Sequence, residues 1–354
     1  MFHPTDDLRI ESLHPLLPPA ILMEELPLTE NISATVTKGR KACSDIFRNT
    51  DDRLMVVVGP CSIHDPVAGI EYAERLAAVS QKHAEDLLIV MRVYFEKPRT
   101  TVGWKGLIND PNLDNSFAIN AGLRAARGFL LNVLDLGLPT GTEFLDPITP
   151  QFIADLVSWG AIGARTSESQ VHRELASGLS MPVGFKNGTD GTVQIAIDAI
   201  GSSLHPHHFL SVTKQGVAAI VETRGNEDCH VILRGGSAGP NYSAEAVAAA
   251  VQGLKAAGLS GRLMIDCSHA NSGKDHAQQP AVIADIAGQI AAGNNDIFGV
   301  MLESFLLDGN QPLGNGTDLI YGLSVTDKCM SWERTEPLFE QMAQSVRDRR
   351  KHLA

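Results

Sequence analysis

Short apolar runs alternate along this chain with amphipathic segments of helical length, such as residues 68–84 and 243–257. This alternation is typical of βαβ units, in which successive strands lie parallel and helices cover the sheet. Eight such runs predict eight strands, the number that closes a (β/α)8 barrel. The runs are residues 54–59, 87–93, 142–145, 161–164, 182–186, 230–234, 263–267 and 298–303. We therefore predict an α/β protein with a TIM-barrel fold.

Two segments do not fit the barrel repeat. Residues 1–53 precede the first predicted strand and contain a helical pattern over residues 30–47, so they form an amino-terminal extension that could cap the barrel or join subunits. Further on, the apolar runs 209–213 and 217–223 are separated by Lys214-Gln215-Gly216. Three residues are too few for a crossover helix, which predicts an inserted β-hairpin at about residues 208–223. The catalytic barrel is expected over residues 54–354.

Composition narrows the range of functions. The 354 residues are 44% hydrophobic and 20% charged, which is typical of a globular protein. A net charge of −12 disfavours nucleic acid and anionic membranes as partners. No run approaches the roughly 20 apolar residues of a membrane span, and residues 1–7 lack the basic and apolar regions of a signal peptide. Five scattered cysteines indicate reduced thiols, so we expect a cytoplasmic protein.

Cationic side chains gather where the predicted strands end, within an otherwise acidic protein. Three of them belong to one basic segment, residues 92–100, which follows the second run. In a (β/α)8 barrel the carboxyl ends of all strands meet on one face, where the functional site lies. Like charges 4 Å apart repel by about 4 kcal/mol at an effective dielectric near 20, so anions must balance them. The cations are Arg92, Lys97, Arg99, Arg165, Lys186 and Arg234. We expect a ligand with more than one anionic group, unless each cation pairs with a neighbouring acid.

A second group of strand-end residues has metal-ligand chemistry. Cys61, His269, Glu303 and Asp327 offer one sulfur, one imidazole and two carboxylates, a mixed set that suits a divalent first-row metal. No short ligand spacing supports the site, and taken singly Cys61 is more often a small core residue and His269 a loop histidine with satisfied hydrogen bonds. The prediction depends on convergence at one barrel face. Glu143 lies in the third run and joins the residues expected at this face of the barrel.

The motifs at these positions resemble one enzyme family over nearly the whole chain. They are Gly59-Pro60-Cys61-Ser62, Arg92 with Lys97-Pro98-Arg99-Thr100, Gly163-Ala164-Arg165, Gly184-Phe185-Lys186-Asn187-Gly188-Thr189, Leu233-Arg234-Gly235-Gly236, Asp266-Cys267-Ser268-His269 and Glu303-Ser304. Together they resemble 3-deoxy-D-arabino-heptulosonate 7-phosphate (DAHP) synthase of the type I alpha class. The resemblance implies condensation of phosphoenolpyruvate with erythrose 4-phosphate and water, which yields DAHP and phosphate in the first step of the shikimate pathway.

The resemblance also implies roles for individual residues. It assigns Cys61, His269, Glu303 and Asp327 to one divalent metal, expected to be Mn2+, with Fe2+, Co2+ and Zn2+ as alternatives. It assigns Arg92, Lys97, Arg165, Lys186 and Arg234 to phosphoenolpyruvate, and Lys97, Pro98, Arg99 and Thr100 to erythrose 4-phosphate. We expect Lys97 to deliver a proton, Glu143 to orient water and Lys186 to stabilise the departing phosphate.

Regulation is implied as well, because members of this class bind an aromatic amino acid as feedback inhibitor and assemble as dimers or tetramers. The matching positions are Asp6, Asp7, Pro150, Gln151, Leu175, Leu179, Ser180, Phe209, Ser211 and Val221. For Leu175 and Leu179 taken alone, ordinary packing of a surface hairpin is the better explanation. Ser211 favours phenylalanine over tyrosine as the inhibitor, since tyrosine-sensitive members of the family tend to carry glycine there.

Three other functions are compatible with a barrel that carries these cations. The sister enzyme 3-deoxy-D-manno-octulosonate 8-phosphate synthase lacks the long extension and carries a different element in place of Lys97-Pro98-Arg99-Thr100. A Schiff-base aldolase would use Lys97 or Lys186 as its nucleophile and would need no metal. A catalytically silent binding protein could share the same barrel, because a fold does not dictate a function. The intact metal and phosphate motifs argue against that last function.

Overall fold

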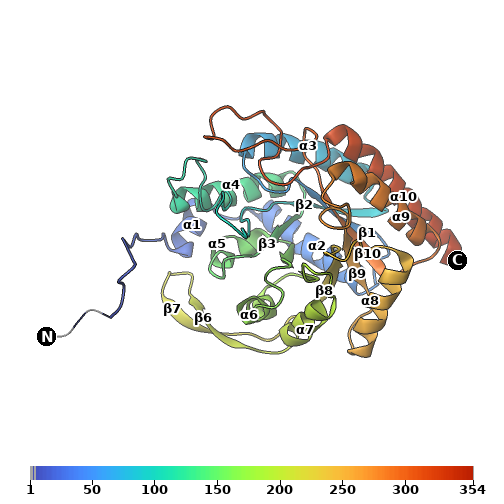
Figure 1. The fold of residues 1–354 in the computed structure, drawn as a ribbon, viewed down its shortest axis with the longest axis horizontal. Coiled ribbons are helices and arrows are strands. Elements are labelled where there is room, and N and C mark those ends of the chain that lie inside the picture. The colour runs from blue at the N-terminus through green and yellow to red at the C-terminus, as the bar shows by residue number, and fades with distance from the viewer. Residues whose placement is uncertain (1–2, 4, 354) are drawn as a thin grey trace.

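The computed structural model describes residues 3 and 5–353; residues 1, 2, 4 and 354, at the ends of the predicted extension and barrel, lie outside the described residues. Eight parallel strands close a barrel in the order β1-β10-β9-β8-β5-β4-β3-β2 (Figure 1), which confirms the predicted (β/α)8 fold. The barrel strands are β1 (Leu54–Gly59), β2 (Leu87–Arg92), β3 (Thr140–Glu143), β4 (Trp159–Ile162), β5 (Val183–Lys186), β8 (Cys229–Leu233), β9 (Leu263–Asp266) and β10 (Ile297–Glu303).

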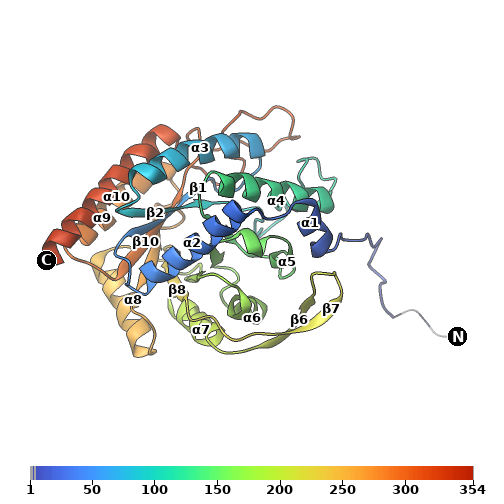
Figure 2. The same cartoon turned by 180° about the vertical axis from the view of Figure 1, so that it is seen from behind.

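Helices surround the barrel on its outside, as Figures 1 and 2 show from opposite sides. They are α3 (Pro66–Lys82), α4 (Ile119–Asp135), α5 (Pro150–Ile153), α6 (Gln170–Gly178), α7 (Gln194–Ser203), α8 (Ala244–Ala256), α9 (Gln279–Ala291) and α10 (Trp332–Leu353), with short 3-10 turns at Ala154–Leu156 and His276–Gln278. Their starts follow local rules: the Asp65 side chain caps α3 by accepting from the backbone N–H groups of Val67 and Ala68. In the described part of the chain, no helix is both long and apolar enough to cross a bilayer.

Alternation along the strands sorts side chains between the barrel interior and the helix layer. Along β2, Leu88 and Val90 belong to the interior cluster, and Arg92 follows on the same face two residues later. Along β9, Met264 is followed in the same way by Asp266. The apolar residues fill the barrel, and the charged ones come last, at the carboxyl ends of the strands. The pattern of period two therefore places the charged groups in the mouth of the barrel.

The amino-terminal extension contains α1 (Pro19–Glu25) and α2 (Glu30–Phe47). Three buried side chains of α2, Cys43, Ile46 and Phe47, join the cluster inside the barrel, so this helix covers the end of the barrel opposite the mouth (Figure 2). The Phe47 ring lies 5.4 Å from the Phe298 ring of β10 in an edge-on arrangement. The segment before α1 projects away from the body of the molecule (Figure 1), and its role in joining subunits stays a prediction.

The inserted hairpin is present outside the barrel, as predicted. Strands β6 (His208–Val212) and β7 (Ala218–Glu222) pair antiparallel and form a separate two-stranded sheet. The turn of the hairpin is attached to the body through Lys214: its Nζ donates to the carbonyl of Gln151 at 2.6 Å, and its own carbonyl accepts from the N–H of Ala20 at 2.7 Å. The hairpin is thus held against α5 and α1.

The predicted positions of two strands are wrong, because each strand begins and ends two residues earlier than predicted. The third strand runs over Thr140–Glu143 and the fourth over Trp159–Ile162, whereas the apolar runs predict residues 142–145 and 161–164. Neither strand begins with a simple apolar run. Gly141 of the third strand pairs with Trp159 of the fourth across the ladder. The indole ring fills the space that a side chain at 141 would occupy: a Cβ atom there would lie 3.0 Å from the ring.

Candidate functional site

A cavity of about 330 Å³ opens at the carboxyl ends of the strands, and all six predicted cations line it. Two further cations, Lys274 and Lys328, also line it, whereas the carboxylates in the lining are Glu143, Glu303 and Asp327. Eight cationic side chains thus face three acidic ones. Since the whole protein carries a net charge of −12, this local excess of positive charge marks the cavity as a site for an anionic ligand.

Only two of the six predicted cations pair with an acid within the described residues. Arg92 Nη2 lies 2.9 Å from Glu303 Oε1, and Lys186 Nζ lies 2.9 Å from Asp266 Oδ2. The other four have no carboxylate within 4.0 Å in the part of the chain that the structure describes; they are Lys97, Arg99, Arg165 and Arg234. Neutralisation by neighbouring acids therefore does not account for the cluster, and these four can balance the charge of a ligand.

Arg92 is fixed by the backbone of the first strand-end loop. Its Nε donates to the carbonyl of Pro60 at 3.1 Å and its Nη2 to the carbonyl of Cys61 at 3.2 Å. Gly59 lets the backbone of Arg92 lie close to this loop, because a Cβ atom at position 59 would be only 2.6 Å from the backbone carbonyl oxygen of Arg92. The Tyr94 ring lies below the guanidinium, with its centroid 3.5 Å from Cζ. Arg92, 1% exposed, is therefore rigid before any ligand binds.

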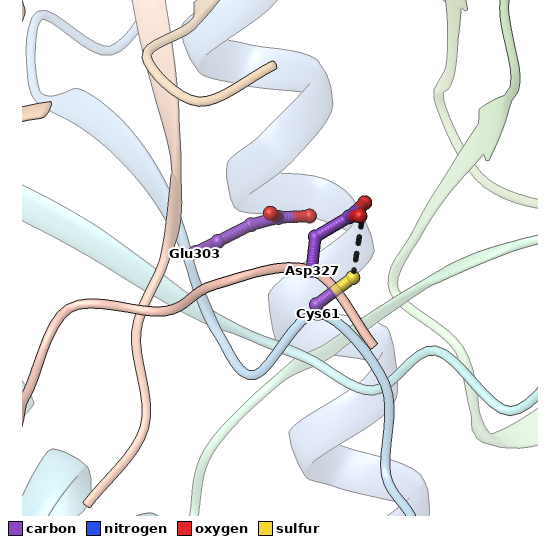
Figure 3. Close-up of side chains that lie close together, drawn as sticks. All are labelled: Cys61, Glu303 and Asp327. Atoms are coloured by element: carbon purple, nitrogen blue, oxygen red, sulfur yellow. Dashed lines mark hydrogen bonds between the residues drawn. The ribbon is translucent and has the colours of Figure 1, made fainter. Parts of the chain in front are cut away.

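A thiol and two carboxylates converge beside Arg92. The ligand atoms of Cys61, Glu303 and Asp327 all lie within 4.8 Å of one another, and Figure 3 shows the three side chains pointing toward a common point. The Cys61 thiol donates to Asp327 Oδ2 at 3.7 Å. Donor atoms that bind one ion at about 2.0–2.3 Å lie within about 4.6 Å of one another, so this arrangement is close to that of a metal site.

His269 lies at the edge of this cluster. Its Nε2 is 3.9 Å from Glu303 Oε1, while its Nδ1 is 2.8 Å from Asp266 Oδ2. The residue adopts a left-handed backbone conformation, with φ of 52°, which a non-glycine residue adopts only when its surroundings enforce it. Here the N–H of Lys274 donates to the carbonyl of His269 at 2.6 Å and closes the loop. The loop thus turns the imidazole toward Glu303.

The chemistry of this donor set fits a divalent metal. One sulfur, one imidazole nitrogen and two carboxylates form the mixed set typical of first-row transition metals, whereas Mg²⁺ and Ca²⁺ prefer oxygen alone. Burial raises the pKa of the Cys61 thiol, and Glu303 raises it further. A thiol in that setting becomes a thiolate when a cation binds it, which couples metal binding to proton release.

The basic segment approaches the same cluster. Lys97 Nζ donates to the carbonyl oxygen of Cys61 at 3.2 Å and contacts its sulfur at 3.1 Å. Arg99 Nε donates to the carbonyl of Trp104 at 2.8 Å, and Arg165 Nη1 donates to the carbonyl of Pro98 at 3.3 Å. Lys97, Pro98 and Arg99 line the cavity.

Thr100 differs from the rest of the predicted set. It is described and exposed, but it is not part of the cavity lining. The structure therefore does not bring Thr100 to the cavity with Lys97, Pro98 and Arg99.

Glu143 lies at the end of β3, 7% exposed, and contributes a carboxylate to the wall of the cavity. Gly163 leaves room for it, because a Cβ atom there would lie 2.5 Å from Glu143 Oε1. Two residues later Arg165 also reaches the cavity. The Gly163-Ala164-Arg165 motif thus combines a small residue beside the carboxylate with a cation for the ligand.

A second cavity of about 360 Å³ lies between α5, α6 and the inserted hairpin. Eight of the ten positions predicted for an inhibitor line it: Pro150, Gln151, Leu175, Leu179, Ser180, Phe209, Ser211 and Val221. Arg40, Asp155 and Lys214 add charge to its wall. Asp6 and Asp7 do not line it; they are exposed on the segment that projects from the body (Figure 1). The structure therefore brings together eight of these residues from three separate segments.

Comparison with known proteins identifies the family. The sequence model of the DAHP synthetase I family matches residues 29–340. The chain belongs to this family. The phenylalanine-sensitive phospho-2-dehydro-3-deoxyheptonate aldolase of Escherichia coli K12 is 61% identical over 350 residues, which cover 99% of this chain and 100% of that protein. The phenylalanine-inhibited enzyme of Saccharomyces cerevisiae is 52% identical, with 98% and 96% covered.

A further relative and a solved structure support the same conclusion. The tyrosine-inhibited enzyme of Schizosaccharomyces pombe is 55% identical and covers 98% of this chain and 94% of its own. The structure of phospho-2-dehydro-3-deoxyheptonate aldolase from Francisella tularensis superposes with a TM-score of 0.94 at 56% identity, and 96% and 99% of the two chains are covered. The family resemblance inferred from the motifs is therefore confirmed, and with it an enzyme of this family on a (β/α)8 barrel.

Sequence reasoning missed several residues of the family site. Lys274 and Lys328 line the cavity but lie 8 and 25 residues beyond the ends of β9 and β10. Asp266 was quoted only as part of a motif, although it contacts both Lys186 and His269. Burial would by itself raise the pKa of its carboxyl, but the charges of His269 and Lys186 hold it well below its ordinary value. The available signal was its place at the end of β9, two residues after interior Met264.

Proposed function

We propose that this protein condenses phosphoenolpyruvate with erythrose 4-phosphate and water to form DAHP and phosphate. One observation carries the proposal: eight cations and three carboxylates line one cavity, beside a cluster of thiol and carboxylate groups. Two phosphorylated substrates supply the anionic groups that such a wall requires, and the relatives named as phospho-2-dehydro-3-deoxyheptonate aldolases cover nearly the whole chain.

The cations divide between the two substrates. Phosphoenolpyruvate carries a phosphate and a carboxylate. The rigid Arg92 suits these groups through bidentate contacts, as do Arg165 and Arg234, which have no carboxylate partner among the described residues. Lys97 and Lys186 add compact charges at the same ligand. Arg99 belongs to the part of the basic segment that would hold the phosphate of erythrose 4-phosphate, together with Pro98. Thr100 joins this set only if the segment moves when the substrate binds.

Cys61, His269, Glu303 and Asp327 would hold the divalent metal of the family, for which we propose Mn²⁺. When bound, such an ion supplies Lewis-acid polarisation of the aldehyde of erythrose 4-phosphate. Fe²⁺, Co²⁺ and Zn²⁺ suit the same donors, and affinity for a mixed site rises along the first-row series toward Cu²⁺, so cellular supply selects the ion.

The residues of the chain then handle charge and protons. The vinyl carbon of phosphoenolpyruvate forms a bond to the aldehyde carbon, water adds at the carbon that bears the phosphate, and C–O cleavage releases phosphate. Lys97 is placed to protonate the new alkoxide; desolvation lowers the pKa of its ammonium, but Cys61, Glu303 and Glu143 together outweigh this effect, so the pKa lies above its ordinary value. Glu143 would orient the attacking water. Lys186 and Arg234 would stabilise the departing phosphate.

We also propose that phenylalanine inhibits the enzyme at the second cavity. The Phe209 and Val221 side chains, which are partners across the hairpin, offer an apolar wall, and Ser211 follows Phe209 two residues later on the same face of β6. Two of the named relatives are phenylalanine-sensitive or phenylalanine-inhibited, and one is tyrosine-inhibited, so their names alone do not decide the inhibitor of this chain. A homodimer or homotetramer and a cytoplasmic location are proposed from the sequence.

A phosphate-release assay tests the proposed function. The protein, first treated with a chelator, is given both substrates with and without added Mn²⁺. Phosphate release that needs both substrates and Mn²⁺ supports the condensation. Phosphate release from phosphoenolpyruvate alone would indicate a phosphatase. Full activity in the chelator would instead favour a Schiff-base mechanism through Lys97 or Lys186.

A further inference from the structure

A single buried carboxylate connects the two halves of the active site. Asp266 ends β9 on the interior face of the barrel and is 0% exposed. It contacts one residue proposed to bind phosphoenolpyruvate and one residue proposed to bind the metal. An ionised carboxylate without access to water is stable only when its oxygens are fully satisfied by charged or polar donors.

The contacts of Asp266 use both oxygen atoms. Oδ2 accepts from Lys186 Nζ at 2.9 Å and lies 2.8 Å from His269 Nδ1. Oδ1 accepts from the backbone N–H of Ser268 at 2.9 Å and from its hydroxyl at 2.6 Å. Four donors therefore surround one carboxylate. Because they approach different oxygens, Ser268 fixes the orientation of the group while Lys186 and His269 share the other oxygen.

This geometry determines which nitrogen of His269 carries a proton. Nδ1 lies 2.8 Å from Asp266 Oδ2 and 2.8 Å from Ser268 Oγ, whose own proton is donated to Asp266 Oδ1. Both neighbours of Nδ1 are therefore acceptors, so Nδ1 must be the donor, and the lone pair of a neutral imidazole then lies on Nε2. Nε2 is the atom that faces Glu303, at 3.9 Å. A carboxylate on the outer nitrogen of a ligand histidine is a common arrangement in metal sites, where it fixes the ring and raises its basicity.

We propose that Asp266 is a positioning residue that serves both sites at once: it holds His269 with Nε2 available to the metal, and it holds Lys186 in the phosphoenolpyruvate site. Loss of the carboxylate then weakens metal binding and phosphoenolpyruvate binding together, although Asp266 does not line the cavity. The inference rests on the proposed function, because it takes its two ligands from there. A simpler role, in which Asp266 only neutralises buried Lys186, would leave metal binding unchanged.

The isosteric variant Asp266→Asn separates the two roles. Its amide oxygen can still accept from Ser268, but its NH2 group would face the Lys186 ammonium and His269 Nδ1. His269 Nδ1 then faces an N–H donor where the wild type has a carboxylate acceptor, which favours the tautomer with its proton on Nε2 and so removes the metal-binding lone pair. We expect the Kd for Mn²⁺ to rise by about tenfold or more, the size typical for loss of such a partner. The Kd for phosphoenolpyruvate should rise as well.

Binding is measured without turnover. Free Mn²⁺ is followed by electron paramagnetic resonance as the metal-free protein is titrated, and phosphoenolpyruvate binding is followed by calorimetry. Lys186→Met is the matched control, expected to weaken phosphoenolpyruvate binding but to keep the Mn²⁺ Kd within about threefold, a change below 1 kcal/mol. The double variant Lys186→Met/Asp266→Asn removes both buried charges, so it guards against misfolding of a single variant, and it should bind Mn²⁺ as weakly as Asp266→Asn.

The outcomes are distinct. Wild-type affinity for Mn²⁺ in both the Asp266→Asn protein and the double variant would overturn the inference while the proposed function stands. Failure of the wild-type protein to bind Mn²⁺ and phosphoenolpyruvate would instead remove the proposed function itself. Weak Mn²⁺ binding by Lys186→Met, equal to that of Asp266→Asn, would also overturn the inference, because the two sites would then be connected through Lys186.

Discussion

Lys97 Nζ lies 3.1 Å from the sulfur of Cys61, so the basic segment and the thiol–carboxylate cluster meet at one contact. The same ammonium donates to the carbonyl of Cys61, which in turn accepts from Arg92. Three residues that the sequence places on two strand-end loops thus converge in one corner of the cavity. A proton donor at this corner lies beside the cluster that would hold the metal, where the new bond is expected to form.

Replacement of this ammonium tests its chemical role. Lys97→Met should lower turnover by about 10²- to 10⁴-fold, the usual contribution of a positioned proton donor. Lys105→Met is the matched control, since Lys105 belongs to the same loop, is exposed and lies outside the cavity lining. It should keep its turnover. Steady-state rates with both substrates check the pair, and a Lys97→Met protein with normal turnover would remove the assignment of Lys97.

The ring of Tyr94 should matter more than its hydroxyl. The ring supports the Arg92 guanidinium at 3.5 Å, whereas the buried hydroxyl has no hydrogen-bond partner among the described residues. Tyr94→Leu should raise the KM for phosphoenolpyruvate by about 3- to 30-fold, because a desolvated cation–π contact contributes about 0.5–2 kcal/mol. Tyr94→Phe should stay near wild type. Equal KM values for the two variants would contradict this role of the ring.

Glu96 should make the folded protein less stable as the pH rises. It is 4% exposed, and burial, followed by the charge of Asp146, raises its pKa from 4.5 to about 8. The folded protein therefore keeps a proton that the unfolded chain loses near pH 4.5. The contribution of Glu96 to the free energy of unfolding is fully present below about pH 4.5. It is lost as the pH rises through about 8, with a slope of at most about 1.4 kcal/mol per pH unit.

Glu96→Gln removes this titration and retains an acceptor for the hydroxyl of Thr149, which donates to Glu96 Oε1 at 3.2 Å. In urea denaturation between pH 5 and pH 9, the free energy of unfolding of the variant should gain on that of wild type as the pH rises, and the gain should level off above about pH 8. A difference that does not change with pH would show that Glu96 titrates normally in the folded protein.

Ser211 should decide between phenylalanine and tyrosine as inhibitor. The wild-type enzyme should be inhibited by phenylalanine in preference to tyrosine, and Ser211→Gly should raise the phenylalanine concentration for half-inhibition by about tenfold, a size typical for one small group in a binding pocket. Activity without inhibitor should be unchanged, since Ser211 lines only the second cavity. Preferential inhibition of the wild-type enzyme by tyrosine would reverse the assignment.

Much of the fold was predictable because each βαβ unit has its own pattern of apolar and polar residues in the sequence. The run at residues 87–93 predicts β2 to within one residue, since a buried parallel strand is a short apolar run between helical patterns. The start of β4 was not predicted, because Trp159 and Gly160 belong to the strand through their pairing with β3, which no local pattern reveals. The six cations were predictable because they follow the strand ends directly.

The rest of the site depends on distances that the sequence does not contain. Lys274 reaches the cavity only because its loop turns back on His269. Asp266 gains its importance from Lys186, 80 residues earlier. The second cavity combines α5, α6 and the hairpin, and its residues came from the family resemblance alone. Asp6 and Asp7 lie on the projecting segment and do not line the second cavity within a single chain.

The central claim is that a carbon–carbon bond forms between two phosphorylated substrates, and nuclear magnetic resonance tests it most directly. Phosphoenolpyruvate labelled with ¹³C at its vinyl carbon is mixed with erythrose 4-phosphate, Mn²⁺ and the enzyme. The vinyl signal should be replaced by that of a methylene carbon coupled to the new chain, with one phosphate released per label transferred. Label that stays in phosphoenolpyruvate, or that appears in pyruvate while phosphate is released, would contradict the claim.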